Sequence, residues 1–215
     1  MNARGADLPG ASGSGSASLG QDSAEDLRSR LLSEATRMFA EEGFARTSVR
    51  LLAERCGCTK PALYYYFKNK EALYREVVTA QIDQVRALMD ATVRADGDLQ
   101  QRLSQGIQGL ISYATRDPFG LLLLHRAPHR KDAGPEDAER EMLGLQGLHM
   151  RALEQLFGEA IERGEISDSV RPRACAIAFA GAIDFRIQLW LQGDEGSLED
   201  LDSVIDLLFN GMKHA

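Results

Sequence analysis

The chain has 215 residues, of which 44% are hydrophobic and 27% charged, and its formal net charge at pH 7 is −7. This composition is typical of a globular protein and excludes a polycation that coats nucleic acid by charge alone. The three cysteines do not form a disulfide framework, and the longest aliphatic run, at 121–124, is far shorter than the ~20 apolar residues that span a bilayer. No apolar segment follows a basic start, so we expect a cytoplasmic protein without a membrane partner.

The charge is distributed unevenly along the chain. Between residues 44 and 70 there are six basic residues and one acidic residue, Glu54, which gives this stretch a net charge of +5 and leaves −12 for the rest. Such asymmetry indicates one small basic surface for an anionic partner on an otherwise acidic body.

The first 22 residues are rich in Gly, Ser and Ala and almost lack large apolar side chains. Such a segment cannot bury enough surface to offset its ordering entropy, so we expect 1–22 to be a disordered arm. A helical period then begins at a possible capping pair, Ser23 and Asp26, and stops at Gly43.

Two short helices and one long helix are expected next, because each apolar period follows a residue that can cap it. The caps are Thr47 or Ser48 for 49–56, Thr59 for 60–67, and Asn69 for the long helix that begins at 70. Gly57 breaks the first short helix, and Pro61 lies in the first turn of the second, where its missing N–H costs little.

The remainder of the chain shows helical periodicity without a convincing strand pattern. The expected helices are 98–116, 118–126, 137–163, 172–192 and 198–212. The sequence therefore predicts an all-α protein of about nine helices.

A short helix, a glycine turn and a second short helix form the layout of a helix-turn-helix, whose second helix enters the DNA major groove. On a helical projection Leu63 and Phe67 fall on the inward side, and Lys60, Tyr64 and Tyr65 face outward together with the proline. The alternative is a helical hairpin with half-buried tyrosines and solvated lysines. The caps, the turn and the local positive charge together favour DNA binding.

Residues 27–78 resemble the N-terminal domain of TetR-family transcriptional regulators. The motifs are "F-x-x-x-G-F" at 39–44, "T-S-V-R-x-[apolar]-A" at 47–53, "G-C-T-K-x-x-L-Y-x-Y-F" at 57–67 and "K-N-K-E-A-L" at 68–73. The resemblance implies a helix-turn-helix DNA-binding domain over 23–72, a helical regulatory and dimerisation domain over 73–215, and repression of transcription that an effector relieves.

Carried over residue by residue, the resemblance implies a set of DNA contacts. They are Ser48, Arg50, Thr59, Lys60, Pro61, Tyr64, Tyr65, Tyr66 and Lys70. Lys70 also begins the long helix, whose N-terminal amides favour an anion, so we expect it to clamp a phosphate. Pro61 stands where the family often has Gly and Tyr66 where it often has His, which leaves the operator sequence open.

A homodimer is expected, because specific DNA sites usually need two recognition helices one helical turn apart. Segment 172–192 is dense in Ala and Gly, which permits close helix approach, and 198–212 carries an apolar stripe. The candidate interface residues are Ile177, Gly181, Leu201, Ile205 and Leu208. Burial of these residues inside one subunit is the alternative.

An effector cavity is expected in the helical domain, for an apolar or amphipathic small molecule. The candidate lining residues are Leu122, Met142, His149, Met150, Phe179 and Phe185. The alternative is a filled core. His149, Asp184 and Arg186 are the candidate polar anchors.

No motif indicates an enzyme, a cofactor or a metal site: a phosphate loop, a G-x-S-x-G elbow and an HExxH pair are all missing from the sequence. His125 and His129 have helical spacing, but Pro128 separates them, and Cys56 and Cys58 fit buried positions better than a redox pair. Besides a ligand-responsive repressor, the sequence leaves open a DNA-bound adaptor whose helical domain binds a protein, and an all-α enzyme with an incidental helix-turn-helix.

Overall fold

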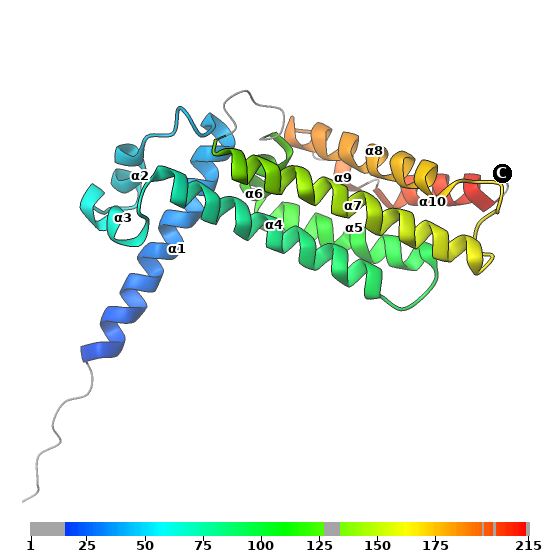
Figure 1. Cartoon of the computed structure of the whole chain (residues 1–215), viewed down its shortest axis with the longest axis horizontal. Coiled ribbons are helices and arrows are strands. Elements are labelled where there is room, and N and C mark those ends of the chain that lie inside the picture. The colour runs from blue at the N-terminus through cyan, green and yellow to red at the C-terminus, as the bar shows by residue number, and fades with distance from the viewer. Residues whose placement is uncertain (1–15, 127–133, 195, 200, 214–215) are drawn as a thin grey trace, which may run out of the picture.

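The structure is a computed structural model that describes residues 16–126, 134–194, 196–199 and 201–213. Every regular element in these ranges is a helix, which confirms the all-α prediction. A small unit lies at one end of the molecule, and long helices aligned with the long axis form the body (Figure 1).

The small unit contains α1 (Ser16–Glu42), α2 (Val49–Arg55) and α3 (Lys60–Tyr66). The body contains α4 (Lys70–Arg94), α5 (Leu99–Arg116), α6 (Pro118–Arg126), α7 (Glu136–Glu162), α8 (Pro172–Leu191), α9 (Gly196–Glu199) and α10 (Leu201–Lys213). The α4 helix begins in the small unit and runs along the body (Figure 1).

Two boundaries differ from the sequence prediction. The first helix begins at Ser16, ahead of the predicted cap at Ser23, so the expected arm 1–22 is helical from 16 onward, and its residues 1–15 lie outside the described part. Ala17, Leu19 and Gln21 are good helix formers, which allows the helix to extend through a Ser- and Gly-containing stretch. The predicted helix 198–212 is divided into α9 and α10.

The predicted start signals operate as hydrogen-bonded caps. The side chains of Ser48, Thr59 and Asn69 accept backbone N–H groups of α2, α3 and α4, and Asp98 forms a capping box with Gln101 at the start of α5. Thr47, the alternative cap, is instead buried and donates its hydroxyl to the Gly43 carbonyl oxygen at 2.8 Å. Capping therefore fixes the lengths of the short helices locally.

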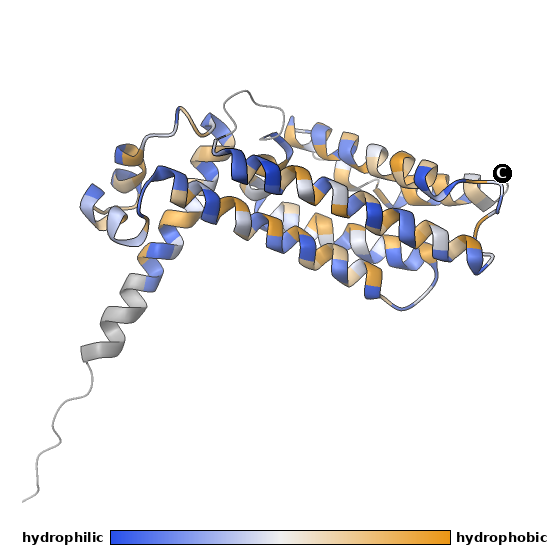
Figure 2. Ribbon diagram, viewed as in Figure 1, coloured by the Kyte–Doolittle hydropathy of each residue, from blue (hydrophilic) through white to orange (hydrophobic). Residues whose placement is uncertain are grey.

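The described residues form two apolar cores, and the helices α4, α6 and α7 contribute side chains to both. The first core is formed by the four helices α1, α2, α3 and α4, by part of α6 and by the start of α7. It includes Phe39, Leu63, Tyr74 and Met142. The second core joins α5 to the end of α7, α8 and α10. Hydrophobic residues accordingly alternate with polar ones along the body helices, as Figure 2 shows.

Close packing of α4 against α5 depends on glycine at position 106. A Cβ atom built on Gly106 would lie 2.6 Å from Oγ1 and 3.0 Å from Cγ2 of Thr92 on α4. Thr92 is β-branched, and its hydroxyl donates to the Leu88 carbonyl oxygen at 2.9 Å, so this side chain has little freedom to move.

We predict that Gly106→Ala lowers the free energy of unfolding by about 1 kcal/mol. The steric overlap costs ~1–3 kcal/mol, which exceeds the ~0.5–1 kcal/mol that alanine gains inside a helix. Gly144→Ala on α7 is the matched control, because a Cβ there meets no atom within 4 Å, and it should raise the stability. Denaturant unfolding of both variants provides the measurement, and a stabilised Gly106→Ala variant would contradict the packing.

Candidate nucleic-acid interface and effector cavity

The α3 helix buries one face and exposes the other, as the helical projection predicted. Leu63 is 0% exposed and Phe67 lies beside it in the first core, whereas Tyr65 is 85% exposed. Tyr64 and Lys60 also face solvent, with the Lys60 ammonium nitrogen 5.7 Å from the centre of the Tyr64 ring. The outward face thus combines a cation with aromatic rings that carry hydroxyl groups, which suits base edges, thymine methyl groups and phosphates.

The remaining tyrosines of the motif have different environments. Tyr66 is half-buried against the first core, and the Tyr65 ring meets it edge-on with the centroids 5.2 Å apart. Tyr74 is buried in α4 and packs edge-on against Phe39 and Phe44. Tyr66 therefore supports the neighbouring ring of Tyr65, and Tyr74 belongs to the core.

Four further candidate DNA contacts are exposed on or next to α2 and α3. Ser48 and Thr59 cap their helices and are exposed, as is Pro61 in the first turn of α3. The Arg50 side chain is largely exposed and pairs with Glu54 one turn along α2, with the two polar atoms 2.8 Å apart. A surface pair of this kind contributes little to stability, so Arg50 can exchange its carboxylate partner for a phosphate.

Lys70 is more confined than the sequence suggested. Its ammonium group donates to the Ala45 carbonyl oxygen at 3.2 Å and lies 4.6 Å from the centre of the Phe44 ring. Burial lowers the pKa of this lysine. An ammonium has three N–H donors. Lys70 thus holds the loop between α1 and α2 and keeps further donors for an anion at the α4 N-terminus.

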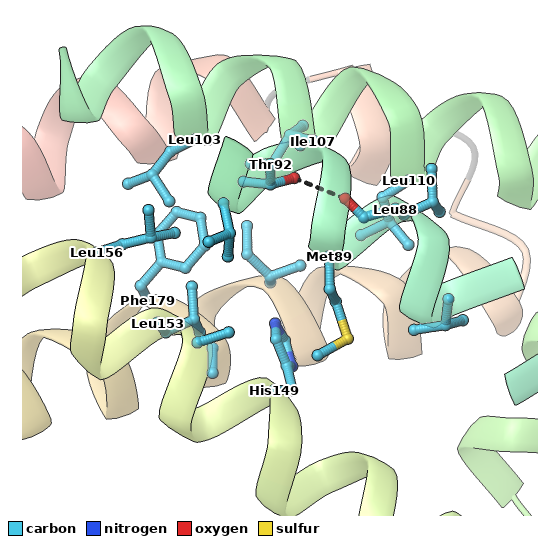
Figure 3. Close-up of a pocket in the computed structure, with 16 residues that line it drawn as sticks. Leu88, Met89, Thr92, Leu103, Ile107, Leu110, His149, Leu153, Leu156 and Phe179 are labelled. Carbon is cyan, nitrogen blue, oxygen red and sulfur yellow. Dashed lines mark hydrogen bonds between the residues drawn. The ribbon is translucent and has the colours of Figure 1, made fainter. Parts of the chain in front are cut away.

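An apolar cavity of about 120 Å³ lies in the body between α4, α5, α7 and α8 (Figure 3). Its lining residues are Val85, Leu88, Met89, Thr92, Val93, Leu103, Gly106, Ile107, Leu110, His149, Ala152, Leu153, Leu156, Phe179, Ala180 and Ile183. The imidazole of His149 rises from α7 beside Met89, toward the leucine side chains (Figure 3). Burial lowers the pKa of His149, so the ring is neutral at pH 7.

Two of the six predicted lining residues, His149 and Phe179, line this cavity. Leu122 and Met142 do not line the cavity, contrary to the prediction. They belong to the first core, because their parts of α6 and α7 pack toward α1 and α4. Met150 packs at the edge of the second core, outside the cavity wall, and Phe185 is 58% exposed on the opposite face of α8.

The other two candidate polar anchors are engaged elsewhere. Asp184 lies 3.4 Å from the imidazole of His125, and Arg186 donates to the Ser197 carbonyl oxygen at 2.7 Å. No lining residue was predicted on α4 or α5, although these two helices supply more than half of the cavity wall. The two glycines at 106 and 109 were the available signal, because a glycine inside a helical period often marks a close approach.

The candidate dimer residues divide between surface and core. Ile177 and Gly181 are exposed on α8, and Leu208 is half-buried on α10. Leu201 and Ile205 were predicted at the dimer interface but are buried inside one subunit, because this side of α10 packs on the second core. By length and composition α8 could cross a membrane, but core helices also pass that test, and 28% of its most apolar stretch is buried.

Cysteine and histidine chemistry gives no second site in the ranges that the structure describes. Burial raises the pKa of the Cys56 thiol, which disfavours the reactive thiolate, and Cys58 is half-buried. The described residues contain no group of three or more potential metal ligands, and His129 lies outside them.

The chain was compared with known proteins. The family model described as "Bacterial regulatory proteins, tetR family" matches residues 31–77. The HTH-type transcriptional regulator TtgR of Pseudomonas putida is 25% identical over 180 residues, which cover 80% of this chain and 83% of that protein. The probable acrEF/envCD operon repressor of Escherichia coli K12 is 23% identical over 181 residues, 80% of each chain.

Among solved structures, the transcriptional regulator FadR from Bacillus subtilis in complex with stearoyl-CoA superposes with a TM-score of 0.69 at 20% identity. The match covers 86% of this chain and 98% of that chain, so the two share a fold. The relatives are transcriptional regulators and not enzymes. Residues 31–77 thus match the tetR family of bacterial regulatory proteins, and with a helix-turn-helix whose second helix faces outward and a helical body behind it, the chain is similar to TetR-family transcriptional regulators.

Proposed function

We propose that the protein is a dimeric repressor that binds a palindromic operator in bacterial cytoplasm and is released by a small apolar or amphipathic effector. The outward face of α3, with Lys60, Tyr64 and Tyr65, carries this proposal. The E. coli relative is named as a repressor and the B. subtilis neighbour was solved with an amphipathic ligand, which supports both parts of the proposal.

A second copy of the chain is the proposed occupant of an apolar surface on α8 and α10. Ile177 and Phe185 are 53% and 58% exposed on α8, and Leu207 is 74% exposed on α10. Small residues, Ala178 and Gly181, lie between the two large side chains of α8 and permit close approach. Two helices from each subunit can then form a four-helix interface.

The α4 helix connects the cavity to the DNA-binding unit. Its first half buries Leu73, Tyr74 and Val77 in the first core, and its second half supplies Leu88 and Met89 to the cavity wall. A ligand that prefers one position of α4 would shift the population of DNA-binding units toward that position. The partly enclosed apolar cavity favours this effector mechanism over the DNA-bound adaptor.

Operator recognition can be tested with DNA selected from a random-sequence library by the wild-type protein. We expect a palindromic site, and we expect Lys60→Ala and Tyr65→Ala each to weaken binding to it by roughly tenfold or more, because each removes a groove contact worth ~1–3 kcal/mol. The control is Arg94→Ala, whose exposed side chain lies at the far end of α4 and which should bind normally. Unchanged binding by both α3 variants would contradict the assignment of α3 to the groove.

The salt dependence of binding tests the role of Lys70. If its ammonium binds a phosphate, Lys70→Ala should lower affinity for all sequences and reduce the slope of log affinity against log salt by about one. The melting temperature should also fall, because the variant cannot form the hydrogen bond to the Ala45 carbonyl oxygen. A weakened complex with an unaltered salt slope would assign Lys70 to loop positioning alone.

Phe185→Asp should convert the dimer into a monomer, because it places a charge in the centre of the proposed apolar interface. Leu143→Asp is the matched control, since Leu143 is an exposed leucine on α7, which is not one of the two helices of the proposed interface. Light scattering after size-exclusion chromatography measures the mass of each variant. A dimeric Phe185→Asp protein would exclude this face.

A further inference from the structure

The dimensions of the cavity limit the size of its occupant, an inference that rests on the proposed effector function. A cavity of about 120 Å³ is close to the ~150 Å³ of an engineered apolar cavity that holds benzene. It therefore accommodates a single-ring molecule and is too small for a long acyl chain. The question is whether the surrounding structure allows the cavity to lengthen.

A buried hydrogen bond between α5 and α4 lies beyond one end of the cavity. The Tyr113 hydroxyl donates to Oε1 of Gln81 at 2.7 Å, and both side chains are buried. These residues lie one helical turn beyond Leu110 and one turn before Val85, the last wall residues in this direction. Opening this end would leave two buried polar groups without partners, which is costly.

An ion pair with a buried guanidinium and a partly exposed carboxylate lies beyond the other end. The Arg102 guanidinium is almost fully buried and pairs with Glu159 of α7, with the two polar atoms 2.9 Å apart. A second nitrogen of the same guanidinium donates to the Val93 carbonyl oxygen on α4. Arg102 precedes the wall residue Leu103, so this link joins three helices at the boundary of the cavity. Separating the pair would leave a buried charge uncompensated.

The helices α4 and α5 cannot approach one another more closely along the cavity wall. Gly106 already meets Thr92, and a Cβ on Gly109 would lie 3.0 Å from Cδ2 of Leu88, so the two helices are in direct contact along the cavity. The cavity, which is partly open to the surface, thus has polar links beyond both ends and close helix packing along one side.

The lining favours a neutral molecule with one polar group. None of the sixteen lining residues is Lys, Arg, Asp or Glu. The Thr92 hydroxyl already donates to the Leu88 carbonyl oxygen. Within the described residues the structure gives the His149 ring no protein hydrogen bond, and the neutral imidazole offers one N–H donor and one acceptor. An anion would lose its hydration here without meeting a cation.

We propose that the effector is a neutral molecule of about the size of one substituted benzene ring, whose single hydroxyl or carbonyl group hydrogen-bonds to His149. The ring fills the space among Leu153, Phe179 and Ile107, and the polar group points toward α7. This assignment gives His149 a specificity role, because it distinguishes a phenol from a hydrocarbon of the same shape.

Isothermal titration of the full-length protein at pH 7 tests the proposal with four probes: p-cresol, toluene, 4-methylbenzoate and stearoyl-CoA. We expect p-cresol to bind more tightly than the other three. His149→Leu should lower the affinity for p-cresol about tenfold and leave that for toluene undiminished, because only the hydrogen bond is removed. A merely structural role of His149 would change both affinities together.

Two cavity-filling variants provide the second arm. Ala152→Phe and Ala180→Leu place additional side-chain atoms in the cavity from α7 and α8, and each should abolish binding of both p-cresol and toluene. Two variants are used so that this test can still be made if one of them fails to fold. Tighter binding of stearoyl-CoA or 4-methylbenzoate, no binding of p-cresol, or p-cresol affinity that survives His149→Leu would overturn the proposal.

The same samples are tested for binding to the selected DNA. If the wild-type protein binds the DNA but fails the probe series, the effector class is wrong and the regulator function stands. If it does not bind DNA at all, the proposed function fails, whatever the cavity holds.

Discussion

The burial of Leu63 and Phe67 determines what the DNA-binding unit can do. The α3 helix has seven residues, too few for a helix that is stable by itself in water, so its shape and direction depend on the core beneath it. Once these two side chains are fixed in the core, the helical geometry leaves Lys60, Tyr64 and Tyr65 no direction except outward. The chemistry of the proposed recognition surface therefore follows from packing on the opposite side of the same helix.

The long α4 helix extends this constraint to the body of the protein. It contributes buried side chains to the core that orients α3 and apolar side chains to the cavity wall. Lys70 adds a polar attachment at its first turn, through the Ala45 carbonyl oxygen. A single rigid element with both roles offers a direct physical connection between an occupant of the cavity and the position of the recognition helix.

The part of the structure that local chemistry controls was predictable from the sequence. Caps at Ser48 and Thr59 fixed the starts of the two short helices, and Asn69 fixed the start of α4. The period of Leu63 and Phe67 gave the correct inward face of α3. Periodicity identifies an apolar stripe but does not tell which neighbour covers it. For that reason Leu201 and Ile205 were assigned to a dimer surface although they pack inside one subunit.

The cavity shows the same limit of prediction from sequence periodicity. Its wall comes from four helices that are distant in sequence, and its volume is what remains after their side chains have packed. His149 and Phe179 were identified because a polar or aromatic residue in an apolar period stands out, whereas Leu88 and Leu103 look like any other core leucine. A leucine that lines empty space carries no local signal that distinguishes it from a leucine in a filled core.

Hydroxyl-radical footprinting of the protein on DNA selected from a random library tests the central claim most directly. If two outward α3 helices enter successive major grooves, the protected backbone should form two equivalent regions, centred about 34–36 Å apart along one face of the duplex. Protection confined to a single region, or spread uniformly without a preferred face, would contradict the account.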